Sequence, residues 1–538
     1  MASTYNQLHF ESRPSPERHI GRLAVMARLF GMEPAPVNNC RVLEIGCSTG
    51  SNIIPQALAY PKSSFLGIDI AERQISVGQE QIKALAIDNI ELQAADIAKV
   101  KTRHKQFDYI ICHGVFSWVA SKVQEKILAF CRETLTPNGL VYLSYNCLPG
   151  WNVRGVIRAS LVQADNLKLN SAERVQQARA AMALMQEQLV DEATMYGLQL
   201  REELASCGLQ SDAFVLHELL EEHCYPFYIK DLADKVGDYK LQYVCESHPS
   251  RMRFSRFAEL LASKPVVNAA AMTRVDREQY LDILFPLSFR GSIFCRKQIE
   301  LREEICLEHL PPLCIASTLV PLKDRPEVHS DDIEVFCGPG DITVEVSDPL
   351  QKAALLYLRT TWPEATPFAE LLKGAWQMVS ADTIDADREA QLAEGLFGYF
   401  LLNLVELHVG PLHCSSIVEH QPLASPFAHL QARDREWVTN LRHEYFRLGA
   451  LERRILLLLD GDNDRDAIVE EVLAMIAKGD FTPGENGQPV TDPDRQKELA
   501  VKQIDCSLEL FSERALLIDS EFGELYSHHT LIFPKTGR

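Results

Sequence analysis

The sequence predicts an α/β protein: a doubly wound, seven-stranded sheet with a helical insertion, followed by a winged-helix-like domain and a helical C-terminal region. Three observations lead to this prediction. Apolar runs of strand length alternate with amphipathic stretches between residues 37 and 150, which is the pattern of parallel strands joined by helices. The strand signal then disappears over 153–222. Strand-like runs return before residue 300.

Five apolar runs in the first 150 residues have the length and composition of buried parallel strands. They are Arg41–Ile45, Ser64–Asp69, Ile90–Ala94, Phe107–Cys112 and Gly139–Tyr145. The amphipathic stretches between them predict helices over Asn52–Tyr60, Glu72–Leu85 and Ser121–Leu135. The segment Thr136-Pro-Asn-Gly139 is typical of a turn that ends a helix and opens a strand.

Two later strand-like runs, Lys240–Cys245 and Phe289–Arg296, complete the predicted sheet, with one strand antiparallel as in many mixed sheets. Insertions after the carboxyl ends of strands lie where ligands bind, so we expect the helical insertion to cover or shape a site. The predicted boundaries are 1–36 for an N-terminal helical segment, 37–300 for the sheet domain, and about 153–222 and 247–286 for its two insertions.

Residues 301–412 predict the winged-helix-like domain, and residues 413–538 the helical C-terminal domain. Asp332–Phe336 and Asp341–Val346 flank Cys337-Gly-Pro-Gly340, which indicates a hairpin. The helical stretches that follow are Pro349–Thr360, Pro367–Met378 and Asp387–Asn403, with a strand-like run at Leu404–Val409 after them. Many acidic residues in this domain favour protein contacts over DNA binding.

The composition argues against several classes of partner. The chain has 538 residues, with 54 Lys and Arg against 74 Asp and Glu, a formal charge of −20. Affinity for a phosphate backbone comes mainly from basic side chains, so we expect no nucleic-acid partner. No apolar run reaches membrane-spanning length, and no Cys-x-x-Cys pair indicates a metal site. We therefore expect a cytoplasmic protein with reduced thiols, no membrane insertion and no metal.

The most informative segment is Val42–Asn52, where an apolar strand runs into two glycines and then a helix. Glycines at such a position allow a tight turn and a close approach of a ligand to the backbone. Asp69 ends the second predicted strand, and Asp96 follows the third. A dinucleotide fits less well, because the usual Gly-x-Gly-x-x-Gly needs a middle glycine that this loop lacks.

The pattern Glu44-x-Gly46-x-x-x-Gly50 resembles motif I of the class I S-adenosylmethionine-dependent methyltransferases, whose fold is Rossmann-like. This resemblance implies S-adenosylmethionine as cofactor. It implies that the loop after Gly46 wraps the amino-acid part, that Asp69 binds the ribose hydroxyls, and that Asp96 with Ile97 contacts the adenine. The expected cofactor-binding residues are Glu44, Gly46, Cys47, Gly50, Asn52, Asp69, Ile70, Asp96, Ile97 and His113.

A resemblance to bacterial methyltransferases with a methyltransferase regulatory domain extends over most of the chain. This group includes the rickettsial lysine methyltransferases that modify an outer-membrane protein. The resemblance implies a protein substrate, and it suggests the helical insertion as the surface of a homodimer. Departures occur at Tyr5–Phe10 and at Gly291-Ser292, and they concern substrate recognition more than the cofactor. The segments that carry the resemblance are Phe107–Val119, Tyr142–Trp151, Leu216–Glu221, Pro226–Tyr228, Leu241–Tyr243, Arg277–Asp282, Phe289-Arg290 and Leu459–Gly461.

Loops after the fourth and fifth strands supply aromatic side chains at the carboxyl edge of the sheet, where they suit a cationic methyl donor and a protonated amine. The catalytic candidates are Trp118, Tyr145 and Glu218, and the substrate-binding candidates are Trp151 and His217. Each aromatic residue is equally compatible with packing of the insertion on the sheet. For Glu218 and Asp282, the simpler interpretation is a solvated helix face.

The predicted function is therefore methyl transfer from S-adenosylmethionine to a protein nitrogen such as that of lysine. Burial by the aromatic loops lowers the pKa of an amine, so the reaction does not require a dedicated strong base. Two alternatives stay open: a methyltransferase acting on a small metabolite, and a cofactor-sensing interaction module without turnover.

Overall fold

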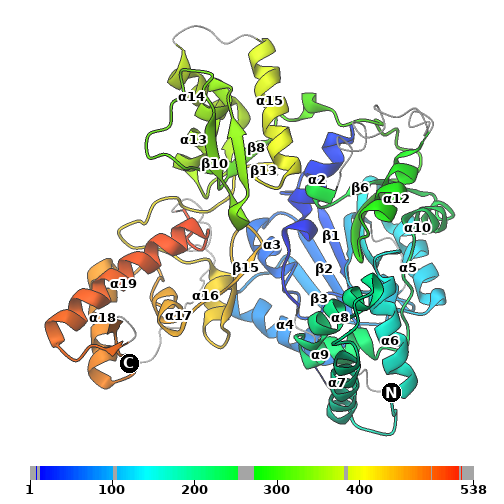
Figure 1. Cartoon of the computed structure of the whole chain (residues 1–538). Helices are drawn as coiled ribbons and strands as arrows, with labels where there is room; N and C mark the ends of the chain where they lie inside the picture. Colours follow the sequence, from blue (N-terminus) through cyan, green and yellow to red (C-terminus); the bar gives the residue numbers. More distant parts are fainter. Residues whose placement is uncertain are drawn as a thin grey trace.

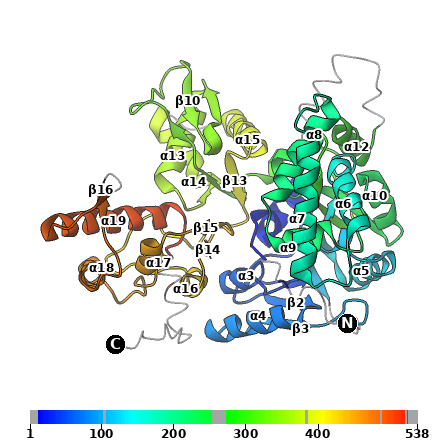
Figure 2. The same cartoon turned by 60° about the horizontal axis from the view of Figure 1, so that its bottom comes forward.

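The computed structural model describes residues 8, 12–100, 106–251, 272–380, 386–485, 488–519 and 523. Three parts follow one another along the chain (Figure 1). A large sheet domain is followed by a smaller α/β part with helices α13 to α15, and then by a C-terminal part with helices α16 to α19 (Figure 2).

The first part is built on a seven-stranded sheet in the order β3-β2-β1-β4-β5-β7-β6. The first five strands run parallel, and β7 is antiparallel to both of its neighbours, as predicted. The strands are β1 (Arg41–Ile45), β2 (Ser64–Asp69), β3 (Ile90–Ala94), β4 (Phe107–Cys112), β5 (Leu135–Asn146), β6 (Leu241–Glu246) and β7 (Phe289–Arg296).

Strand β5 begins four residues earlier than the sequence predicted. Phe107 pairs with Leu135 and Tyr109 with Leu140, so the register shifts between these two pairs. The segment Thr136–Gly139, which we expected to form a separate turn, is therefore an irregularity within the strand. An extra segment that bulges from one strand can be accommodated where the ladder is interrupted.

Helices cover both faces of the sheet and create two hydrophobic cores. Helix α2 (Ile20–Leu29) is buried on nearly all sides, because it lies between the sheet and the middle part of the chain. Helices α5 (Ser121–Thr134) and α10 (Ile229–Gly237) pack on the opposite face. The remaining helices around the sheet are α3 (Ile54–Ala59), α4 (Glu72–Ala84) and α12 (Arg274–Leu284).

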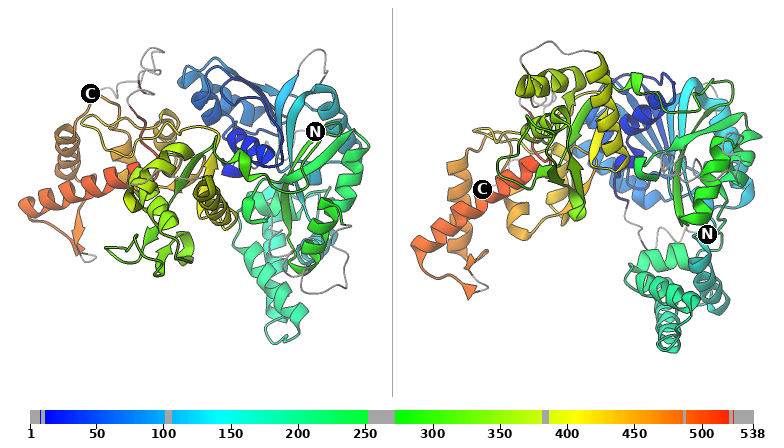
Figure 3. Two further views of the ribbon diagram at one scale, coloured as in Figure 1. Left: turned by 90° about the horizontal axis from the view of Figure 1, so that it is seen from above. Right: turned by 45° about the horizontal axis from the view of Figure 1, so that its top comes forward.

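The predicted helical insertion is present directly after β5, and it projects from the body of the molecule (Figure 3). It has its own small core, in which Ile157, Leu161, Val175 and Leu204 are buried. Its elements are α6 (Asn152–Ala164), α7 (Ser171–Gln188), α8 (Met195–Gly208), α9 (Asp212–Phe214) and the π-helix η3 (Val215–Leu219). Of the second expected insertion, 247–286, the structure describes residues 247–251 and 272–286, which contain η4 (Pro249–Arg251) and α12.

The middle part contains two three-stranded sheets with helices packed against them. The predicted hairpin is formed by β10 (Glu334–Cys337) and β11 (Thr343–Val346), which pair antiparallel. A second sheet has the order β12-β8-β13. The other elements of this part are β8 (Cys314–Ser317), β9 (Val320–Pro321), α13 (Pro349–Thr361), β12 (Thr366–Pro367), α14 (Phe368–Val379), α15 (Ala386–Leu401) and β13 (Val405–His408).

The C-terminal part is largely helical, as predicted, and it also contains short strands. Strands β14 (Trp437–Thr439) and β15 (Tyr445–Arg447) form an antiparallel pair. Strands of three residues are too short to show a periodic pattern of apolar residues in the sequence. A further short pair, β16 (Gly484–Glu485) and β17 (Gln488–Pro489), lies between the last two helices. The helices are α16 (Pro426–Ala432), α17 (Ala450–Leu456), α18 (Arg465–Lys478) and α19 (Pro493–Glu513).

Candidate active site

The loop after β1 makes a sharp turn that depends on glycine. Gly46 and Gly50 have φ angles of 77° and 75°, in the left-handed region that favours glycine. A Cβ atom added to Gly46 would lie 2.3 Å from Cγ2 of Val115 in the loop after β4. The Gly46 N–H donates to the carbonyl of Ile68 at 2.7 Å, which fixes the loop to the end of β2.

Asp69 at the end of β2 is oriented by the backbone on both sides. Its two carboxylate oxygens each accept one N–H, from Ser48 and from Ala71, both at 2.8 Å. Burial raises the pKa of Asp69, and the backbone hydrogen bonds counteract this effect. The next side chain, Ile70, is 57% exposed and offers an apolar surface beside the carboxylate.

Glu44 is a buried carboxylate directly beneath the same loop. Its Oε1 accepts a hydrogen bond from Nδ2 of Asn52 at 3.0 Å, whereas its Oε2 has no hydrogen-bond partner among the described residues. Burial raises the pKa of Glu44 to about 7, although the charge of nearby Arg18 opposes the shift. A buried oxygen without a partner is costly, so a ligand with a donor group fits this position.

Asp96 and Ile97 follow β3 next to these residues. The Ala95 N–H donates to the Asp69 carbonyl at 2.8 Å, so the ends of β2 and β3 meet. The Asp96 carboxylate accepts the N–H of Ala98 at 3.0 Å and lies 3.2 Å from Nζ of Lys99. Ile97 packs against the core, and Cys47 is buried behind the loop.

His113 follows β4 and lies among aromatic rings. It stacks on Tyr142 and meets Phe289 edge-on, with ring centroids 6.0 Å and 5.6 Å away. Its Nδ1 lies 3.1 Å from the Tyr142 hydroxyl. Burial lowers the pKa of His113 well below its usual range, so the ring is neutral near pH 7.

Two tryptophans and an acid meet where the helical insertion adjoins the loops after β4 and β5. Trp118 and Trp151 contact each other edge to face, with centroids 5.8 Å apart. Arg154 lies over the Trp151 ring at 5.2 Å, and its Nη1 is 4.0 Å from Glu218. The Glu218 side chain is 24% exposed, and burial raises its pKa to about 7, so Glu218 is partly buried rather than on the fully solvated helix face of the simpler interpretation.

The insertion is tied to this edge through the segment after η3. The N–H of Tyr225 donates to the Ser117 carbonyl at 2.8 Å, and that of Phe227 donates to the Asn146 carbonyl at 2.9 Å. His217 faces away toward the N-terminal segment, where its Nε2 lies 2.8 Å from the Leu8 carbonyl oxygen. Of the insertion candidates, Glu218 is therefore linked to Trp151 through Arg154, whereas the Nε2 of His217 is engaged elsewhere.

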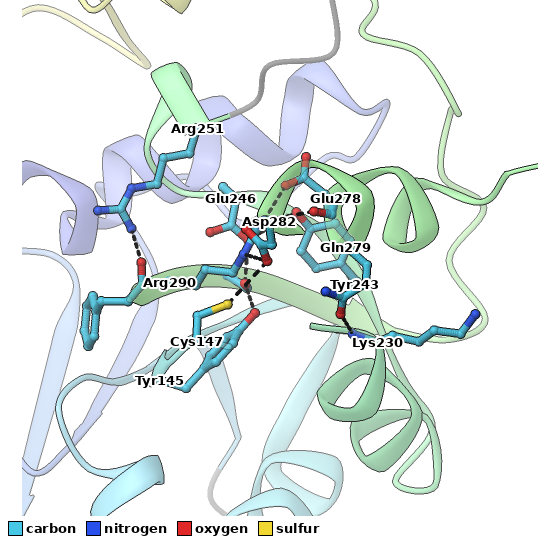
Figure 4. A network of polar contacts seen from close by, with 12 residues as sticks. Tyr145, Cys147, Lys230, Tyr243, Glu246, Arg251, Glu278, Gln279, Asp282 and Arg290 are labelled. Carbon is cyan, nitrogen blue, oxygen red and sulfur yellow. Dashed lines mark hydrogen bonds and ion pairs between the residues drawn. The ribbon is translucent and has the colours of Figure 1, made fainter. Parts of the chain in front are cut away.

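Tyr145 lies apart from the tryptophans, inside the sheet. Its side chain is 1% exposed, and its hydroxyl is 3.0 Å from the Ser292 hydroxyl on β7. It borders a buried polar network in which the Arg290 guanidinium contacts three carboxylates (Figure 4). These are Glu246 at 2.9 Å, Glu278 at 2.8 Å and Asp282 at 2.8 Å. The expectation of a solvated Asp282 is therefore wrong, because this side chain is fully buried.

Comparison with known proteins matches three family descriptions to successive parts of the chain. "Methyltransferase domain" covers residues 36–222, "Predicted methyltransferase regulatory domain" covers 211–296, and "PKMT, C-terminal winged helix domain" covers 420–516. Among relatives, RP028 of Rickettsia prowazekii is 35% identical over 227 residues, which are 41% of this chain and 91% of that protein. The chain belongs to the S-adenosylmethionine-dependent methyltransferases with a regulatory domain.

Longer matches extend this likeness over nearly the whole methyltransferase. RP789 of Rickettsia prowazekii is 28% identical over 522 residues, covering 96% of this chain and 93% of that protein. The structure of PKMT2 from Rickettsia typhi is similar with a TM-score of 0.84 and 26% identity, covering 95% of this chain and 100% of PKMT2. PKMT2 in complex with AdoHcy matches with a TM-score of 0.83.

The comparisons place the winged helix domain in a different region from the one that the sequence analysis predicted. The family description matches 420–516, within the part we expected to be a helical C-terminal domain, whereas we had placed a winged-helix-like domain at 301–412. Both regions combine helices with short antiparallel strands. Short hairpins combined with a few helices are common to many small domains, so the pattern of elements alone did not distinguish the two regions.

The cofactor of this methyltransferase is S-adenosylmethionine, and the residues around the first loop fit it. The glycine turn leaves the backbone open, Asp69 is fixed for a hydroxyl donor, and Glu44 retains one free oxygen. Among the described residues, no group of three or more His, Cys, Asp or Glu is placed to hold a metal ion. In the same part of the chain, no helix is long and apolar enough to cross a membrane.

Sequence reasoning missed three contributors to this site. Gly78 lies in the middle of α4, and a Cβ there would approach the Thr49 carbonyl oxygen to 2.5 Å, so α4 packs directly on the loop. An isolated glycine within a helical pattern was the available signal. Arg154 beside Glu218 carried no signal, and neither did His443, whose Nε2 lies 2.8 Å from Oδ1 of Asn52.

Proposed function

We propose that this methyltransferase transfers a methyl group to the side-chain nitrogen of lysine in a protein substrate. The observation that carries the proposal is the match with PKMT2 along 95% of this chain, which includes the insertion and both later parts. A methyltransferase for small metabolites would share the sheet domain but has no evident need for the same additional parts.

The arrangement around Trp118 and Trp151 supports a cationic acceptor. Aromatic faces attract an ammonium group with roughly 0.5–2 kcal/mol, depending on how far it is removed from water. Arg154 lies over the Trp151 ring, and this contact supports a cation-binding role for the aromatic side chains here. We propose that Trp118 and Trp151 form a wall of the acceptor site and that Glu218 lies beside the amine.

The chain's own groups must align two reactants and remove one proton. S-adenosylmethionine supplies a methyl group on a positively charged sulfur, and the acceptor nitrogen displaces that sulfur in line. A lysine with its usual pKa of ~10.4 arrives protonated and must lose a proton before it reacts. A carboxylate at Glu218, with a pKa of about 7, can accept this proton at the carboxylate oxygen while the aromatic side chains exclude water.

The net charge supports a basic polypeptide as partner. A charge of −20 favours the approach of a lysine-bearing substrate and disfavours nucleic acid.

The proposal is tested by incubating the purified protein with a bacterial lysate and S-adenosylmethionine labelled in the methyl group. The reaction is then separated into protein, RNA and small-molecule fractions. We expect label in protein. Label confined to small molecules would support the metabolite alternative, and cofactor binding without any transfer would support the sensor alternative; either result would overturn the proposal.

A further inference from the structure

A side chain from the C-terminal part reaches the cofactor loop of the first part. His443 lies in the turn between β14 and β15, and its Nε2 is 2.8 Å from Oδ1 of Asn52. The two residues are 391 positions apart in sequence, and both are buried, with His443 3% exposed. In Figure 1 the β15 label lies beside that of α3, the helix that begins just after Asn52, which agrees with this contact.

The direction of the hydrogen bonds is determined by chemistry. In its ionised form the Glu44 carboxylate only accepts, so Nδ2 of Asn52 donates to Oε1 of Glu44, and Oδ1 of Asn52 is left as an acceptor. Nε2 of His443 therefore carries the proton and donates. Burial lowers the pKa of His443 well below its usual range, which keeps the imidazole neutral with a single N–H.

The turn that carries His443 is held in place by two other regions. The Leu441 N–H donates to the Ala515 carbonyl at 3.0 Å, and Nδ2 of Asn440 donates to the Arg514 carbonyl at 2.8 Å. Arg442 donates to the Pro363 carbonyl at 2.8 Å, and it also forms an ion pair with Glu406 of the middle part.

The Asn52 end of the contact is equally constrained. The Asn52 carbonyl accepts from Nε2 of Gln56 at 2.8 Å, and Oε1 of Gln56 accepts the Ile20 N–H at 2.9 Å. The start of α3 is thus held by the N-terminal segment from one side and by His443 from the other. His443 thus adds a second constraint on the Asn52 amide, beside the hydrogen bond from Asn52 to Glu44.

We propose that His443 is a positioning residue for the cofactor: it fixes Asn52, which in turn orients the Glu44 carboxylate beneath the cofactor loop. The C-terminal part therefore completes the cofactor site, and affinity for the cofactor depends on its docking.

The test compares two variants of His443 that carry amide side chains of different length. In His443→Gln the side-chain N–H extends about as far as Nε2 of histidine, whereas in His443→Asn it is one methylene shorter. Asparagine also tolerates the backbone of residue 443, whose φ is 66°, so this variant is expected to fold. By isothermal titration with S-adenosylhomocysteine, we expect His443→Asn to bind about tenfold more weakly and His443→Gln to stay within about threefold of wild type.

A second readout is independent of the cofactor. Hydrogen exchange of the backbone amides over residues 46–53 in the cofactor-free protein should be faster in His443→Asn than in wild type and His443→Gln. The control is His429→Asn, because His429 is a largely buried histidine of the same part whose Nε2 lies 3.1 Å from the Leu457 carbonyl oxygen. We expect it to lower thermal stability without changing either readout.

Two results would overturn the proposal. One is wild-type affinity for S-adenosylhomocysteine in a folded His443→Asn protein with unchanged exchange of residues 46–53. The other is an equal loss of affinity in His443→Asn and His429→Asn, which would indicate general destabilisation of the C-terminal part.

Discussion

Asp69 presents its carboxylate in a single orientation, because the N–H groups of Ser48 and Ala71 bind one oxygen each. We propose that the remaining acceptor positions bind the ribose hydroxyls of the cofactor. Asp69→Asn should weaken cofactor binding about 10- to 100-fold, since a hydrogen bond to a charged group contributes ~1.5–3 kcal/mol. Titration calorimetry measures this change, and exposed Asp88→Asn is the matched control. Unchanged affinity in Asp69→Asn would remove Asp69 from the cofactor site.

Glu44 makes the stability of the cofactor-free protein depend on pH. Because burial raises its pKa from the usual 4.5 to about 7, the folded protein binds this proton more tightly than the unfolded chain. The resulting stabilisation is fully present below pH 4.5 and is lost as the pH rises through about 7. Glu44→Gln cannot lose this proton, so its stability relative to wild type should improve by roughly 2–3 kcal/mol between pH 5 and pH 8. Denaturation curves at several pH values measure the difference, and a constant difference would contradict the assignment.

Glu218 should determine the pH dependence of methyl transfer if it accepts the proton of the acceptor amine. Its pKa of about 7 means that the wild-type rate should rise as the pH passes from 6 to 8. In Glu218→Gln, we expect kcat to fall at least about 100-fold and the rise near pH 7 to disappear. The control is Glu222→Gln, which alters an exposed acid of the same region. A slower variant with an unchanged pH profile would assign Glu218 a packing role.

At the level of single residues, the sequence identified the site residues that lie within one local motif. It missed residues that reach the site from distant parts of the chain. Gly46, Gly50 and Asp69 were recognisable, because strand, turn and helix determine their positions within 30 residues. The contact of His443 with Asn52 joins residues 391 positions apart, and no periodicity records it. Asp282 was assigned to solvent because its partner Arg290 lies on a strand whose pairing the sequence does not state.

The buried network on β6, β7 and α12 is the element-level feature that most affects stability. Arg290 is 1% exposed and is the central cation between Glu246, Glu278 and Asp282. Removing the cation leaves carboxylates without compensation, so Arg290→Met should destabilise the protein by about 3–5 kcal/mol or prevent folding. Denaturant unfolding and soluble yield measure this effect.

The control for this network is a surface ion pair. Arg447→Met breaks the exposed contact with Glu436 and should change stability by less than about 1 kcal/mol. Neutralising all three acids in the Arg290→Met background should restore part of the loss. If Arg290→Met and Arg447→Met are equally stable, the network does not hold these elements together.

Among the secondary-structure elements, the seven strands of the sheet and the helical insertion were predictable, because each is long enough for its periodicity to be visible. The start of β5 was misplaced, since a Pro-Asn-Gly segment is typical of a turn and the strand pairing overrides it here. The β14–β15 pair was missed because three-residue strands carry no periodicity.

For the whole molecule, three parts share contacts around the cofactor loop. Helix α2 lies between the large sheet and the middle part, and the β14–β15 turn joins the C-terminal part to Asn52. The boundaries at 36/37, 300/301 and 412/413 stay predictions, as does the homodimer. On the proposed role of His443, the C-terminal part contributes to the methyltransferase site through its contact with Asn52.

The central claim is that the methyl group is transferred to lysine. The most direct measurement is mass spectrometry of peptides from lysate proteins after incubation with wild-type enzyme and isotopically labelled S-adenosylmethionine, with Asp69→Asn as the reference. We expect labelled methyl groups on lysine side chains that depend on the wild-type enzyme. Labelled methyl groups on another side chain, or on no protein at all, would contradict it.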